Sequence, residues 1–270
     1  MQLFGLQKYE KITKRVICQN FHTMTQSNAI IETIDRLGGV ATLNQIYQHI
    51  FEIKDCKWGS KTPLNSIRYY VRHTDGIYRI KPGLYALESH RQTLERSGII
   101  VQDEKNKDSD EVKQFNHSYY QGLLLEIGNL HNYSTFVPEQ DKGKMFLTKP
   151  LGSVRSLQAI PRFSYDRLVK RSSTIDVIWF NENQMPHSFF EVEHSTDIKN
   201  SLLKFYDLQD FYVRMVIVAD EKRRQEFLNI LSFDAFHRLK KEKRVAFLSY
   251  ESLEKQYEQD LQRVDLEFLL

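Results

Sequence analysis

The chain has 270 residues, of which 41% are hydrophobic and 27% are charged, and its formal net charge is +3. This composition is typical of a globular protein with room for one large domain or two ordinary ones. No apolar run approaches the ~18 residues that a membrane span requires, so we expect no membrane association. Residues 1–100 carry 14 Lys and Arg against 8 Asp and Glu, whereas residues 101–270 carry 24 against 27. A basic first part and an acid-bearing second part suit a DNA contact joined to a metal site.

The two cysteines, Cys18 and Cys56, form neither a disulfide framework nor a zinc-spacing pattern. The first residues are followed by charge rather than by an apolar segment and a small-residue cleavage site. We therefore expect no signal peptide and a location in the reducing cytoplasm.

Residues 1–26, with scattered cations and apolar residues, are interpreted as an N-terminal arm. Residues 27–90 predict a winged helix-turn-helix domain. Apolar residues at helical spacing predict three helices: one stopped by Gly38 and Gly39, one capped by Thr42, and one with Pro63 in its first turn. The sequence KPG then separates two short apolar segments, which predicts a hairpin with a basic tip.

The third of these helices has two distinct faces. Leu64, Ile67 and Val71 share one face, and polar side chains occupy the other. Arg, Asn and Tyr at helical spacing are typical of a recognition helix in the major groove, and a basic hairpin tip is typical of a wing. The predicted DNA-binding residues are Lys61, Asn65, Arg68, Tyr69, Arg72 and Lys81. The alternative is a winged helix that contacts another protein.

Two segments of this domain, TLNQIYQHI and YRIKPGLYAL, resemble the HARE-HTH winged-helix family. That family is associated with enzymes that act on DNA and with the sensing of modified bases. The resemblance implies the fold, and it makes a requirement for methylated cytosine worth testing.

Residues 91–114 are interpreted as a linker, because VQDEKNKDSDEVK is charged and has few apolar residues. Residues 115–270 then form the second domain. Its predicted helices are residues 118–130, 199–212, 221–231 and 250–262, and its predicted strands outside the central hairpin are residues 133–137, 214–219 and 245–249. Strands separated by helices predict a mixed α/β sheet, so the fold class is α/β, with an α+β chain overall.

The central hairpin comprises two apolar strands, residues 174–180 and 187–192, around a polar turn. If the turn is centred between residues 183 and 184, Asp176 faces Glu191, and Glu193 projects on the same face as Glu191. Carboxylates placed so closely repel one another and raise one another's pKa, whereas a divalent cation would stabilise them. A solvated edge hairpin would also tolerate the acids, but flanking residues that are apolar on both faces are typical of a buried strand.

Asp176 followed after fourteen residues by Glu191-Val192-Glu193 resembles the core motif of the PD-(D/E)XK nucleases. Thr174-Ile175 replaces the Pro that usually precedes the Asp. Glu193 replaces the Lys, as in some restriction endonucleases of this superfamily, which carry Glu-x-Glu. The resemblance covers about residues 119–219, and the helix that precedes the hairpin in this family usually contributes a Glu, here Glu126.

The resemblance implies a metal-dependent type II restriction endonuclease that hydrolyses phosphodiester bonds of double-stranded DNA, with Mg²⁺ or Mn²⁺ as cofactor. Asp176 and Glu191 would bind the metal, and Glu126 would bind or orient the metal or its water. Glu193 would take the place of the usual Lys, as water positioner or weak base. Either Lys199 or Lys204 on the following helix would supply the cation that the motif lacks, and Lys204 is the candidate. Two cuts in a duplex often require a dimer, so a homodimer is expected.

A second hypothesis belongs to another class. The chain would be a winged-helix transcription regulator or DNA-binding adaptor whose nuclease-like domain is inactive. The missing motif Lys favours it, the three retained acids oppose it, and stabilisation by Mg²⁺ or Mn²⁺ discriminates the two. A nuclease that recognises DNA shape at junctions or damage is a third hypothesis.

Overall fold

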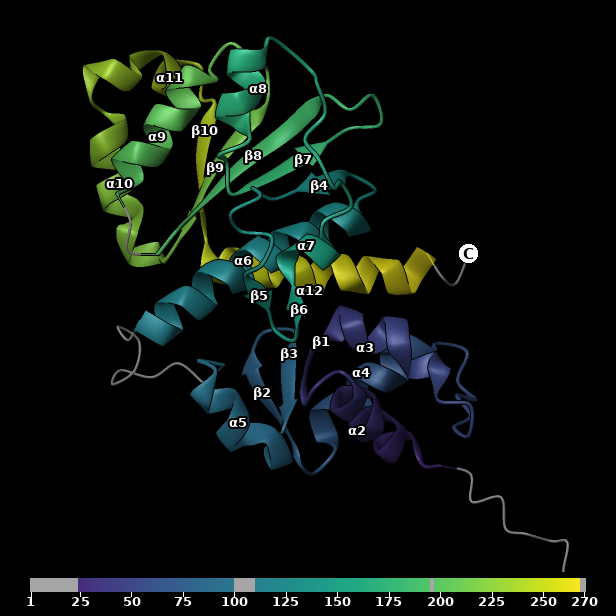
Figure 1. Ribbon diagram of the computed structural model, residues 1–270. Helices are drawn as coiled ribbons and strands as arrows, with labels where there is room; N and C mark the ends of the chain where they lie inside the picture. Colours follow the sequence, from purple (N-terminus) through teal and green to yellow (C-terminus); the bar gives the residue numbers. More distant parts are fainter. Residues whose placement is uncertain (1–23, 100–109, 195–196, 268–270) are drawn as a thin grey trace, which may run out of the picture.

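The structure is a computed structural model that describes residues 24–99, 110–194 and 197–267. Figure 1 shows a small α/β part below a larger sheet, with the helices α6 (Asp110–Leu130) and α12 (Tyr250–Glu267) between them. These two helices contact each other, so the first and last helices of the larger part pack together beside the smaller part. Most of the predicted N-terminal arm, residues 1–23, lies outside the described residues.

The smaller part contains the three predicted helices, α2 (Gln26–Arg36), α3 (Leu43–His49) and α4 (Pro63–His73). Its antiparallel sheet has the order β1-β3-β2, and its strands are β1 (Val40–Thr42), β2 (Ile77–Lys81) and β3 (Leu84–Leu87). Local chemistry sets the boundaries as predicted: Thr42 and Gln45 form a capping box at α3, and Pro63 opens α4. Gly38 and Gly39 have positive φ, which ends α2 at low steric cost.

The larger sheet is mixed and has the order β10-β9-β8-β7-β4. Its strands are β4 (Ser134–Phe136), β7 (Val177–Phe180), β8 (Pro186–Glu193), β9 (Arg214–Ala219) and β10 (Val245–Ser249). β4, β7 and β8 pair antiparallel, whereas β9 and β10 run parallel to β8. The predicted hairpin register is confirmed, because Val177 pairs with Phe190 and Trp179 with Ser188; an irregularity at Phe180 then shifts the register beside the turn.

The central strands are buried on both faces of this sheet, as their apolar sequence predicts. Trp179 and Phe190 belong to a core that includes α6 and α12 and continues into the smaller part. Ile178 and Phe189 belong to a second core against α9 (Ile198–Asp207). Because the two parts share the first core, a change at their contact surface affects the stability of both.

The observed helices α5 and α6 differ from the prediction for the linker and for the helix that follows it. α5 (Arg91–Arg96) lies inside the predicted linker, and α6 begins at Asp110 rather than at residue 118. Of the other linker residues, 100–109 lie outside the described residues. The other elements are η1 (Ile50–Glu52), η2 (Glu88–His90), β5 (Met145–Phe146), β6 (Lys149–Pro150), α7 (Leu151–Val154), α8 (Asp166–Ser172), η3 (Glu221–Arg223), α10 (Arg224–Leu231), η4 (Asp234–Phe236) and α11 (His237–Lys241).

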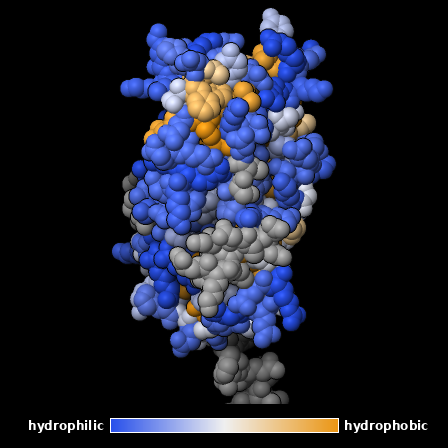
Figure 2. Space-filling view, turned by 90° about the vertical axis from the view of Figure 1, so that its left-hand side faces the viewer, coloured by the Kyte–Doolittle hydropathy of each residue, from blue (hydrophilic) through white to orange (hydrophobic). Residues whose placement is uncertain are grey.

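The surface is mainly hydrophilic in the view of Figure 2, with an apolar area towards the upper end. Leu228 of α10 and Phe233 after it are among the exposed apolar side chains of the larger part. Within the described ranges, no helix is long and apolar enough to cross a membrane. Cys56 is buried and carries a free thiol.

Candidate active site

The predicted acids Asp176 and Glu191 meet where β7 begins and β8 ends. The backbone N–H of Asp176 donates to Oε1 of Glu191 at 3.4 Å, and the N–H of Val192 donates to Oδ2 of Asp176 at 2.8 Å. The pairing of β7 with β8 creates this arrangement, because it places the residue before β7 opposite the end of β8. The two carboxylates therefore share one end of the sheet, as the sequence predicts.

Burial makes this pair of carboxylates electrostatically costly. Glu191 is only 2% exposed, and burial together with the charge of Asp176 raises the pKa of Glu191 well above its usual value. Burial likewise raises the pKa of Asp176, although the nearby His117 and Lys204 oppose this shift. Ionising both carboxylates requires additional positive charge close to them.

Lys204 supplies one such charge from α9. Its Nζ lies 2.7 Å from Oε2 of Glu191 and donates to the carbonyl oxygen of Thr174 at 3.0 Å. Ser201, one turn earlier, donates to Glu191 at 2.9 Å and also to Glu193. The structure thus brings Lys204, Glu191 and Glu193 together, as the sequence predicts.

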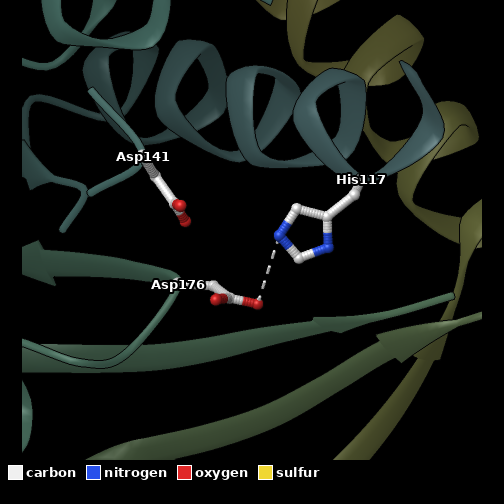
Figure 3. A group of neighbouring side chains, drawn as sticks. All are labelled: His117, Asp141 and Asp176. Atoms are coloured by element: carbon white, nitrogen blue, oxygen red, sulfur yellow. Dashed lines mark ion pairs between the residues drawn. The ribbon is translucent and has the colours of Figure 1, made fainter. Parts of the chain in front are cut away.

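Two further residues at this site were not identified from the sequence. His117 on α6 and Asp141 in the turn between β4 and β5 join Asp176, and one ligand atom from each lies within 4.8 Å of the others. Figure 3 shows these three side chains pointing toward one another from separate elements. Nε2 of His117 is 3.8 Å from Oδ2 of Asp176.

Gln121 and Lys144 hold this group in place. Nε2 of Gln121 donates to Oδ2 of Asp141 at 2.8 Å and to the carbonyl oxygen of Asp176 at 3.3 Å. Nζ of Lys144 lies 2.7 Å from Oδ1 of Asp141. His117 and Gln121 are one helical turn apart, which is a recognisable signal, but His117 precedes the start predicted for the helix. Asp141 lies in the sequence QDKGK, whose two lysines make the segment basic, so the sequence alone does not indicate a metal ligand there.

The prediction that Glu126 joins these acids is wrong for this geometry. Glu126 accepts hydrogen bonds from the hydroxyl groups of Tyr257, at 2.6 Å, and of Thr42, at 3.1 Å. It lies nine residues after His117 on α6, which turns it to the opposite side of the helix. Burial raises the pKa of Glu126 to about 7. Its carboxyl group therefore lies at the contact with the smaller part, not at the end of the hairpin.

Five of the six predicted DNA-binding residues lie on the surface of the smaller part. Lys61, Asn65, Tyr69 and Arg72 are exposed and Arg68 is half-buried, whereas Leu64, Ile67 and Val71 are buried, as predicted for the two faces of α4. Tyr69 stacks on His73, with ring centroids 4.2 Å apart. This outer face of α4 presents cations and an aromatic side chain to solvent.

The prediction for Lys81 is wrong, because the hairpin tip is covered by the larger part. The Lys81 side chain is 11% exposed; its Nζ donates to the hydroxyl of Tyr120 at 3.1 Å and lies 3.8 Å from Glu254. Burial lowers the pKa of Lys81. Its ammonium group thus contributes to the contact between the two parts and is not available to a DNA backbone.

The family of this chain follows from its similarity to known proteins. The profile of the family described as "Type II restriction enzyme NmeDI C-terminal domain" matches residues 99–269 of this chain. The chain belongs to this family. The matched residues include α6, the hairpin and α9, so they contain every member of the Asp176 group described above.

One curated relative of this chain is the type II restriction enzyme NmeDI of Neisseria meningitidis serogroup C. It is 27% identical over an alignment of 133 residues, and the match covers 46% of this chain and 38% of the relative. The chain therefore matches less than half of the length of this relative. No solved structure matches the chain.

Proposed function

We propose that this protein is a metal-dependent DNA endonuclease of the PD-(D/E)XK type and acts as a type II restriction enzyme. The main support for the proposal is that Asp176, Glu191 and Lys204 lie together at the end of the hairpin. In the motif that the sequence resembles, two acids and a Lys occupy such a position. Here the ammonium group comes from α9, while Glu193 stands at the position of the motif Lys. Membership of the NmeDI family supports the same reaction class.

The donor set of the site fits a divalent metal ion. Carboxylate oxygens are the preferred ligands of Mg²⁺ and Mn²⁺, and Asp176 and Glu191 would hold the ion. Burial raises the pKa of each carboxylate, and Lys204 opposes this shift only in part, so a bound cation would stabilise the ionised pair. Gln121, which is fully buried beside Asp176, has an Oε1 atom with no hydrogen-bond partner among the described residues. This oxygen can accept a hydrogen bond from a water molecule at the site.

A bound divalent ion would supply a coordinated water of lowered pKa and would neutralise charge on the scissile phosphate. The residues of the chain prepare this chemistry. Lys204 places an ammonium group beside Glu191, where it can hold the attacking water or a phosphate oxygen. Glu193 and Ser201 are hydrogen-bonded to each other, so Glu193 is oriented and can accept a proton from the water.

The smaller part is proposed to be a winged-helix domain that binds double-stranded DNA through the outer face of α4. Its support is the order of helices and strands and the exposed row of polar residues on α4. Cations on this face would neutralise phosphates, while Asn65 and Tyr69 would contact bases. The hairpin tip is left out of this proposed contact, since the Lys81 side chain is only 11% exposed and lies against Glu254.

Digestion of paired plasmid DNAs, one unmethylated and one cytosine-methylated, tests the function. Each is incubated with Mg²⁺, with Mn²⁺ and with EDTA. Discrete fragments that form only with a metal support the proposal, and the substrate that yields them decides whether methylation is required. Tight DNA binding without cleavage under all conditions would instead support the inactive, regulatory protein. Size-exclusion chromatography with and without DNA tests the proposed homodimer, which would cut both strands.

A further inference from the structure

We propose that His117, Asp141 and Asp176 form a metal site that prefers transition-metal dications such as Mn²⁺ over Mg²⁺. The proposal rests on the proposed function for the role of the site, because it adds two ligands beyond Asp176 and Glu191. The three residues come from α6, from the turn after β4, and from the residue before β7. Only the folded chain brings these elements together.

The spacing of the donor atoms fits a shared ion better than an ordinary ion pair. Nε2 of His117 and Oδ2 of Asp176 are 3.8 Å apart, too far for a hydrogen bond. By contrast, His131 contacts Asp260 at 3.0 Å. Ligand atoms at ~2.1 Å from one ion lie roughly 3.0 to 4.2 Å from one another. The three donors lie within 4.8 Å of one another, so side-chain movements of roughly 1 Å would bring them to these separations.

The surroundings of the three residues provide an independent argument. Gln121 is fully buried and donates through Nε2 to Asp141 and to the backbone of Asp176, while its Oε1 has no partner among the described residues. An amide oxygen fixed in this way next to a carboxylate pair suits a water bound to an ion. Lys144 fixes the other oxygen of Asp141, and such outer contacts orient metal ligands.

The ligand types determine the preferred ion. Mg²⁺ takes oxygen ligands almost entirely, whereas an imidazole nitrogen suits transition-metal dications. One imidazole and two carboxylates therefore favour Mn²⁺ over Mg²⁺ at this position. Asp176 also faces Glu191, so it connects the His117 side of the site with the Lys204 side.

Electron paramagnetic resonance of the full chain loaded with Mn²⁺ tests the site directly. Pulsed spectra of the wild type are expected to show coupling of Mn²⁺ to an imidazole nitrogen. This coupling should disappear in His117→Gln and persist in His131→Gln, the matched control with a histidine just beyond the same helix. Titration of the free Mn²⁺ signal should show an affinity loss of about tenfold or more in His117→Gln. The affinity for Mg²⁺ should change less than about twofold.

Absence of nitrogen coupling in the wild type, or Mn²⁺ affinity unchanged in both His117→Gln and Asp141→Asn, would overturn the proposal. Both variants are first compared with the wild type by thermal unfolding, and the wild-type spectrum by itself is decisive if either fails to fold. The proposed function fails separately. A wild type that shows the coupling but cuts no DNA keeps the metal site and loses the nuclease, whereas cleavage without coupling keeps the nuclease and loses this site.

Discussion

Asp176, whose side chain is 13% exposed, and the buried Glu126 are both carboxylates of the larger part, and burial raises the pKa of each, yet their surroundings differ. Glu126 stands alone between two hydroxyl groups, those of Thr42 and Tyr257. Asp176 is adjacent to a buried acid, Glu191, and to the side chains of His117 and Lys204.

A raised pKa does not identify an active site by itself. A lone acid that accepts hydrogen bonds from two hydroxyl groups has partners for its oxygens within the protein, and it stabilises a contact surface. Two adjacent acids surrounded by cations remain costly until further positive charge arrives. The arrangement at Asp176 is therefore typical of a site that binds a ligand, and the arrangement at Glu126 is typical of structure.

The largest expected effect is that of Asp176→Asn on DNA cleavage. If the bound metal supplies several kcal/mol of transition-state stabilisation, losing a ligand lowers the rate on the order of 10³-fold. The melting temperature should not fall, because the substitution removes repulsion with Glu191. Plasmid cleavage rates and thermal unfolding measure both effects. The exposed Asp210→Asn is the control, and full activity in Asp176→Asn would show that Asp176 is not part of the active site.

Lys204→Gln should lower the cleavage rate on the order of 100-fold, because it removes the ammonium group beside Glu191. Without this charge the pKa of Glu191 should rise further, so the loss should be greater at lower pH. Single-turnover rates between pH 6 and pH 9 test this expectation. Lys199→Gln on the same helix is exposed and should behave like the wild type. Equal effects of both substitutions would mean that a general loss of charge, not this position, matters.

Lys81→Met should lower the free energy of unfolding by about 2 kcal/mol, since it leaves the largely buried Glu254 without its cation. DNA affinity should remain within about twofold of the wild-type value after correction for the folded fraction. Urea unfolding and fluorescence anisotropy measure the two quantities. The matched exposed variant Lys61→Met should do the reverse, weakening DNA binding without changing stability. If Lys81→Met is as stable as the wild type but binds DNA weakly, the hairpin tip contacts DNA.

The smallest effect is expected for Glu126→Gln, which should leave cleavage within about twofold of wild type. Its pKa is about 7 in the folded protein and near the ordinary value of 4.5 when unfolded. The folded state therefore binds the proton more tightly, and the free energy of unfolding falls as the pH rises from 4.5 to 7. Glu126→Gln should flatten this fall by about 1.5 kcal/mol between pH 5.5 and pH 7.5, measured by urea unfolding. Glu88→Gln is the exposed control, and a large loss of cleavage in Glu126→Gln would return this residue to the active site.

The sequence by itself determined the main strands of the larger sheet and its hairpin. β9 and β10 have the predicted boundaries, and the register that places Asp176 opposite Glu191 is confirmed. The physical reason is that strand alternation and a short turn are local, so neighbouring residues decide which side chains face each other. Lys204 could also be found, because it lies on the helix that follows β8 directly.

Tertiary structure alone decided the neighbours from distant elements. An amphipathic pattern for α6 cannot say which face meets the sheet, so the sequence selected Glu126 and missed His117, which lies on the opposite side. Asp141 becomes part of the group only because its turn folds against α6. The burial of Lys81 likewise depends on α6 and α12 covering the hairpin tip. These contacts join residues far apart in the chain, and packing between elements, not local preference, determines them.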